Sequence, residues 1–382
     1  MRRGNLLRAR ARRIRGRVGL KDKDVAVPVL YILLLFVPLS LGLKYLASAS
    51  SLWIFISGAA AIAVLAECIR RATEQLAERV GPAIGGLLTV SFGSIAELVL
   101  ALVVLASGET AVVQAQITGS IIGTSLFGLG LAIIVGGATR ERQTFNSEKA
   151  GLLSTLLILV VIALLLPAVF DYTGRIEGHA PDLRVTDEEL SLGASAVLLV
   201  LYVANLAYTL ITHRDVFAAV EPRGKASWGL GTSLGVVVAA TVVIAVEAEM
   251  VSGALTATAG ALHLSPLFLG VIVLGLVGTI ADLFAASWFA HQDKMGLVLN
   301  ICISSAIQVG LVVAPLLVII SWLMGRPMNL VFSNPLHLFA IAGTAFIVDA
   351  IARDGETTWF EGLLLVGVYV LFGLAFFFSG PV

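Results

Sequence analysis

The stretch SFGSIAELVLA, Ser91 to Ala101, places one carboxylate, Glu97, inside a run of apolar residues too long for an ordinary surface helix. A second stretch, LVGTIADLFAA from Leu276 to Ala286, places Asp282 in the same kind of setting. A carboxylate at the middle of a bilayer costs at least ~2.5–3.5 kcal/mol on insertion scales. Each of the two positions therefore needs a physical reason.

The composition is that of a membrane protein. Of the 382 residues, 58% are hydrophobic and only 13% are charged, and the mean hydropathy is +0.98. These values are far too apolar for a soluble domain of this size, so we expect a multi-pass protein whose surroundings are a lipid bilayer. The formal net charge of zero gives no reason to expect a nucleic-acid partner.

Apolar runs of about 20 residues predict an all-α integral membrane fold with eleven transmembrane helices. The predicted spans are residues 25–46, 51–70, 83–106, 111–137, 150–170, 190–211, 228–250, 265–290, 296–323, 331–352 and 358–379. Segments of about ten alternating residues, which a transmembrane β-barrel would need, are not seen in the sequence.

Basic residues predict the orientation of the spans. Basic clusters precede the first predicted span and follow the second, fourth and sixth, so they fall on one side if the spans alternate. The positive-inside rule makes that side cytoplasmic, together with the N-terminus. We expect the membrane to be a prokaryotic plasma (inner) membrane.

The two acidic stretches belong to an internal repeat. Gly93-Ser94-Ile95-Ala96-Glu97-Leu98 aligns with Gly278-Thr279-Ile280-Ala281-Asp282-Leu283, and a small polar pair follows each one, Gly119-Ser120 and Ser304-Ser305. Each half then holds five spans, and because five is odd the second half enters the membrane from the opposite side. Such inverted repeats place a transporter's substrate site at their interface near the bilayer midplane.

This repeat predicts the organisation of the chain. The expected parts are a basic cytoplasmic N-terminus at 1–24, an extra helix at 25–46, a first repeat at 51–211, a cytoplasmic linker at 212–227 and a second repeat at 228–382.

Helical spacing predicts which side chains share the interface. Each half offers one acid, hydroxyls beside it and further oxygen ligands on the next helix, a set that suits a hard cation. The candidate cation- and proton-binding residues are Glu97, Asp282, Ser94, Thr279, Ser120, Thr124, Ser305 and Gln308, with Glu97 and Asp282 as the metal ligands. Gly93, Gly278 and Gly119 are the repeat glycines, and Glu74 and Glu249 are possible vestibule acids. For the hydroxyl residues, close helix packing is an equally good interpretation.

The acid pair predicts proton coupling. A carboxyl in a low-dielectric setting tends to take up a proton, and a second acid nearby adds to this tendency. Protonation and metal binding then compete for the same oxygens, which is the physical basis of a proton-coupled antiporter. Such a transporter needs no cofactor, and no phosphate-binding pattern G-x-x-x-x-G-K-[ST] is present in the sequence.

Several segments resemble the calcium/proton exchangers of the cation/calcium antiporter superfamily. Gly81–Gly137 and Gln143–Pro167 resemble the first repeat of that family, Leu267–Trp322 resembles the second, and Asp354–Phe378 resembles the last two spans. The resemblance implies a bundle of inverted repeats, alternating access, and exchange of Ca²⁺ for protons.

The sequence departs from the family pattern around the acids. Ser94 and Thr279 stand where the family has asparagine, Asp282 replaces a glutamate, Leu283 replaces a histidine, and Thr124 replaces another asparagine. A hydroxyl reaches less far than an amide carbonyl. Na⁺, K⁺, Mn²⁺ or Mg²⁺ are therefore alternatives to Ca²⁺. A membrane protein of this fold that binds a cation without transporting it is a further alternative.

Overall fold

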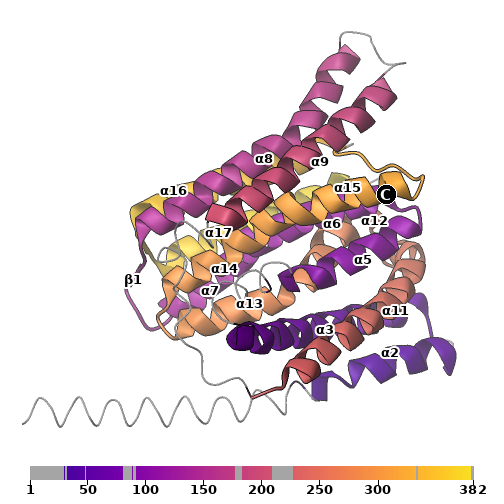
Figure 1. Cartoon of the computed structure of the whole chain (residues 1–382), viewed down its shortest axis with the longest axis horizontal. Coiled ribbons are helices and arrows are strands. Elements are labelled where there is room, and N and C mark those ends of the chain that lie inside the picture. The colour runs from indigo at the N-terminus through magenta and orange to yellow at the C-terminus, as the bar shows by residue number, and fades with distance from the viewer. Residues whose placement is uncertain are drawn as a thin grey trace, which may run out of the picture.

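The computed structural model describes residue 30, residues 32–47 and 49–80, residue 88, and residues 92–176, 183–208, 227–332 and 334–379. Nearly all of this part of the chain is helical (Figure 1). The helices of the first half are α2 (Phe36–Tyr45), α3 (Ser51–Val80), α5 (Ile95–Ala106), α6 (Thr110–Ile122), the π-helical turn η1 (Gly123–Gly128), α7 (Leu129–Gly137), α8 (Ser147–Ile176) and α9 (Leu183–Ala207).

The second half has the matching order. Its helices are α11 (Leu230–Leu262), α12 (Pro266–Phe268), η3 (Leu269–Leu274), α13 (Gly275–His291), α14 (Met295–Gln308), η4 (Val309–Val313), α15 (Ala314–Leu323), α16 (Pro335–Asp354) and α17 (Trp359–Ser379). Two short strands, β1 (Gln143–Thr144) and β2 (Glu356–Thr357), pair antiparallel.

The predicted spans are confirmed in kind and in order. Within the described residues, nine helices or helix runs are long and apolar enough to cross a membrane, and α5 is a shorter apolar helix of 12 residues. The chain is an all-α integral membrane protein of two inverted five-helix halves with an extra N-terminal helix. Of the first predicted span, 25–46, the structure shows α2; residues 25–29 and 31 lie outside the described part.

The largest differences from the predicted spans are at the ends of α3 and α11. The span predicted to end at residue 70 continues to Val80, because ion pairs of Arg70 with Glu67 and Glu74 stabilise the helix beyond its apolar part. The span predicted to end at residue 250 continues to Leu262 through a run of small residues that lowers the hydropathy without breaking the helix. Glu249 therefore lies near the middle of α11 and not near its outer end.

Contacts between loops support the alternation of the spans. At one end of the bundle, Gln143 after the fourth span pairs with Thr357 before the eleventh. At the same end, Nε of Arg140 lies 3.4 Å from Oδ1 of Asp293 in the loop after the eighth span. At the other end, Arg326 in the loop after the ninth span donates to the carbonyl oxygen of Ala106, at the end of the third. The loops after the fourth, eighth and tenth spans therefore gather at one end.

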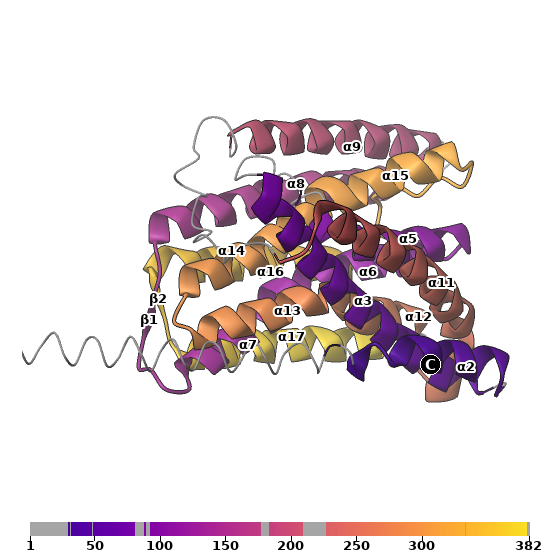
Figure 2. The ribbon, with the colours of Figure 1, turned by 60° about the horizontal axis from the view of Figure 1, so that its bottom comes forward.

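The bundle has a central layer in which the two halves cross. Figures 1 and 2 show α2, α3 and α11 together on one side of it and α8 and α9 on another, with α13 between α3, α6, α7 and α14. At the crossing of α6 and α13, a Cβ at Gly275 would lie 2.5 Å from the carbonyl carbon of Gly119. Only glycine allows the backbones of the two halves to approach so closely.

Candidate functional site

The side chain of Glu97 crosses from the first half to the second. It stands in the first turn of α5 and is 3% exposed. Its Cγ lies so close to Gly278 on α13 that any Cβ at that position would overlap it. The carboxylate also interacts electrostatically with that of Asp282, one turn further along α13. The structure thus brings the two sequence-predicted acids to the same interface.

In the same way, the first half's motif around Gly93 contacts the second half. Ser94 stands at the position directly before α5, and its hydroxyl donates to Oε1 of Gln308 at 3.2 Å. A Cβ at Gly93 would lie 3.2 Å from the same amide oxygen. Gln308 ends α14, directly before the π-helical turn η4. The motif of each half therefore packs on a candidate residue of the other half.

The predicted hydroxyl residues divide into two groups. Ser305 lies beside the Asp282 carboxylate, and Ser120 lies beside Glu97 while donating to the Gly275 carbonyl oxygen at 3.3 Å. Thr124 and Thr279 instead donate to carbonyl oxygens of the preceding helical turn, at 2.8 and 3.1 Å. Their protons are engaged by the backbone, while their oxygens keep lone pairs for another ligand.

Glu97 has buried oxygen atoms without a partner. Neither of its carboxylate oxygens takes part in a hydrogen bond, and Oε1 of Gln116 on α6 is also buried and unpaired. Nε2 of Gln116 donates to the Glu97 carbonyl oxygen at 3.3 Å. Burying an unpaired polar group costs roughly 2–7 kcal/mol, so these oxygens suit a proton or a cation. The sequence prediction missed Gln116, although an amide within an apolar run was a visible signal.

A charged cluster on α3 faces Asp282. The Arg70 guanidinium donates to both oxygens of Glu67, at 2.7 and 2.8 Å, and to Glu74 at 2.5 Å. Arg70, Glu67 and Glu74 all interact electrostatically with Asp282. Glu74 was predicted as a vestibule acid, whereas Arg70 was interpreted as a topology signal. The structure adds a fixed positive charge to the surroundings of the acid pair.

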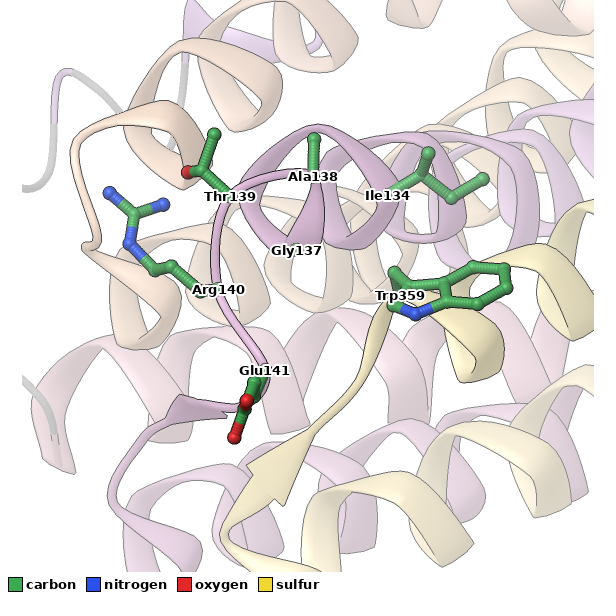
Figure 3. A pocket seen from close by; sticks show the side chains of 7 residues that line it. All are labelled: Ile134, Gly137, Ala138, Thr139, Arg140, Glu141 and Trp359. Carbon is green, nitrogen blue, oxygen red and sulfur yellow. The ribbon is translucent and has the colours of Figure 1, made fainter.

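Two further features lie apart from the acids. Glu249, the other predicted vestibule acid, is exposed near the middle of α11. A surface pocket of about 460 Å³ lies at the end of α7, lined by Arg140, Glu141, Trp359 and their neighbours (Figure 3). None of the candidate site residues lines it. Among the described residues, no group of three or more His, Cys, Asp or Glu side chains could hold a metal ion.

The fold and these contacts define a class of protein. Inverted repeats that meet at buried ionisable residues near the bilayer midplane are the architecture of secondary transporters. The chain belongs to the sodium/calcium exchanger protein family, whose model matches residues 50–211 and 232–378.

Named relatives and solved structures agree with this assignment. The chain is 37% identical to a Ca(2+)/H(+) antiporter of Aphanothece halophytica, over 91% of this chain and 95% of that protein. It is also 37% identical to the Ca(2+)/H(+) antiporter ChaA of Bacillus subtilis (strain 168), over 83% and 89% of the two chains. The structure of native YfkE matches with a TM-score of 0.78 and 32% identity, over 91% of this chain and 99% of that one. The H+/Ca2+ exchanger CAX has the same fold, with a TM-score of 0.66 at 17% identity.

Proposed function

We propose that this protein is a proton-coupled antiporter that exchanges Ca²⁺ for H⁺ by alternating access, with Glu97 and Asp282 as the shared binding groups. The observation that carries the proposal is the Glu97 carboxyl, which is buried against Gly278 of the opposite half with both oxygens unpaired. The relatives that are named Ca(2+)/H(+) antiporters support the choice of Ca²⁺ and H⁺ as substrates.

The exchange follows from competition for the carboxyl oxygens. In one state the acids hold Ca²⁺, with oxygens of Ser94, Ser120, Ser305 and Gln308 as further ligands. In the other state the acids hold protons, which neutralise them without a metal. Each acid belongs to a different half, so a movement of one half against the other exposes the pair to opposite sides in turn. No resident cofactor takes part in this scheme.

The orientation and boundaries are part of the same proposal. The N-terminus and the linker at 212–227 are cytoplasmic, and the protein lies in a prokaryotic inner membrane. The two repeats are 51–211 and 228–382. The basic clusters before the first predicted span and after the second, fourth and sixth support this orientation.

Transport in everted membrane vesicles tests the function. In vesicles from a host that lacks its own Ca²⁺/H⁺ antiporters, we expect added Ca²⁺ to dissipate a preformed proton gradient, followed with an acridine-type pH dye. Na⁺, K⁺, Mn²⁺ and Mg²⁺ are added in parallel. A response to none of these cations overturns antiport, and a response only to a cation other than Ca²⁺ overturns the substrate.

Arg70→Gln is expected to lower the KM for Ca²⁺ by about fivefold, which corresponds to ~1 kcal/mol. The substitution removes a positive charge that acts on Asp282, and it takes one cationic partner from each of the carboxylates of Glu67 and Glu74, which then attract the ion more strongly. The dependence of the dye signal on Ca²⁺ concentration gives the KM. Arg71→Gln is the matched control, since Arg71 pairs with Glu67 on the same helix. Equal KM values for both variants would show that Arg70 has no special effect.

A further inference from the structure

A second buried acid lies outside the candidate cation site. Glu247, near the middle of α11, is 0% exposed. Its Oε1 is 2.6 Å from the hydroxyl oxygen of Ser40 on α2. Ser40 is also 0% exposed. On the other side, a Cβ at Gly58 of α3 would lie 3.4 Å from Oε2. Glu247 is therefore enclosed between the extra N-terminal helix and the first helix of each repeat.

The hydrogen bonds around Ser40 contain too few protons for an ionised Glu247. The Ser40 oxygen lies 2.6 Å from Oε1 of Glu247 and 2.8 Å from the carbonyl oxygen of Val37. A serine hydroxyl has one proton to donate, and a carbonyl oxygen has none. If Glu247 were a carboxylate, two acceptors would compete for that proton, and Oε2 would stay buried without a partner.

A protonated Glu247 satisfies the same geometry. The acid then donates from Oε1 to the Ser40 oxygen, and Ser40 donates its own proton to the Val37 carbonyl oxygen. Each short contact then has one donor and one acceptor, and Oε2 becomes the carbonyl oxygen of a neutral acid. An unpaired carbonyl oxygen in an apolar setting costs far less than an unpaired carboxylate oxygen.

Apart from the exposed Glu249 on its own helix, the charged side chain near Glu247 belongs to α2. Lys44, one turn beyond Ser40 on α2, interacts electrostatically with Glu247, and its Nζ lies over the ring of Tyr45. The part of α3 around Gly58 has no ionisable residue between Trp53 and Ala66. α5 also packs on α11, but its one acid, Glu97, lies against α13. α12 carries no ionisable residue.

We propose that Glu247 is a second proton-binding site of this protein, whose bound proton holds the extra helix α2 on the second repeat through Ser40. α2 lies outside both segments that match the family model, so the contact adds an element beyond the matched halves. Loss of the proton leaves a bare carboxylate between α2, α3 and α11, which weakens the packing of α2. The site is separate from the acid pair and does not depend on the cation that the protein transports.

Infrared spectroscopy of the purified protein in lipid nanodiscs tests the protonation directly. A protonated carboxyl has a C=O stretching band that a carboxylate lacks. We expect Glu247→Gln to remove one such band and Ser40→Ala to shift it, because the acid loses its acceptor. Glu249→Gln is the matched control: this acid is exposed on the same helix, and its replacement is expected to leave the Glu247 band in place.

The outcomes separate this site from the transport function. A wild-type spectrum identical to that of Glu247→Gln in this region overturns the proposal, because Glu247 is then ionised. If Glu247→Gln does not fold, the absence of any shift in Ser40→Ala overturns it equally. The infrared bands are measured without transport, so failure of Ca²⁺/H⁺ exchange in vesicles leaves this result unaffected.

Discussion

Glu97→Gln and Asp282→Asn are each expected to reduce Ca²⁺-dependent dissipation of the proton gradient to the level of vesicles without the protein. Each amide keeps the size of the acid it replaces, so the packing of residue 97 against Gly278 is preserved. An amide side chain, however, does not take up a proton at the pH of the assay. It also lacks the negative charge that holds a divalent cation. Exchange needs both properties at the same atoms.

The measurement is the vesicle assay with Ca²⁺, combined with quantification of the protein in the membrane. Glu249→Gln removes an acid that is exposed on α11 and lies in a different helix from the pair. This variant is expected to keep its exchange activity. Wild-type exchange in both Glu97→Gln and Asp282→Asn would contradict the site assignment, even if the protein is an antiporter.

The sequence predicts the fold well because hydropathy is a local signal and because the repeat is visible in the residues themselves. Each apolar run is long enough to form a helix by itself in a bilayer, where backbone groups must be paired within the segment. The similarity of the stretches around Glu97 and Asp282 then relates the two halves. The ends of α3 and α11 are harder to predict, because both helices continue through residues that are charged or small.

The contacts of the site could be predicted only in part. Repeat symmetry indicates that Glu97 and Asp282 share an interface, and the structure adds that Glu97 packs on the opposite glycine. The bond of Ser94 to Gln308 and the position of Arg70 beside Asp282 depend on how the helices cross. The burial of Glu247 and the exposure of Glu249 likewise follow from the rotation of α11 about its axis. No spacing within a single helix contains that information.

Gly119→Ala is expected to destabilise the protein strongly. A Cβ at this position of α6 would overlap the backbone carbonyl of Val271 in η3, and a backbone atom in a packed helix has little room to move. Overpacking of this kind costs roughly 1–3 kcal/mol and occasionally more. The two halves would have to separate at their crossing, so exchange is also expected to be lost.

Thermal unfolding of the purified protein in detergent measures this effect. Gly253→Ala on α11 is the matched control, because a Cβ there has no atom within 4 Å. In a helix interior, replacing glycine by alanine without a clash is expected to stabilise by about 1 kcal/mol. The unfolding temperature should therefore fall in Gly119→Ala and stay constant or rise in Gly253→Ala. Equal unfolding temperatures of the two variants would show that α6 and η3 do not make the close contact on which the meeting of the two halves depends.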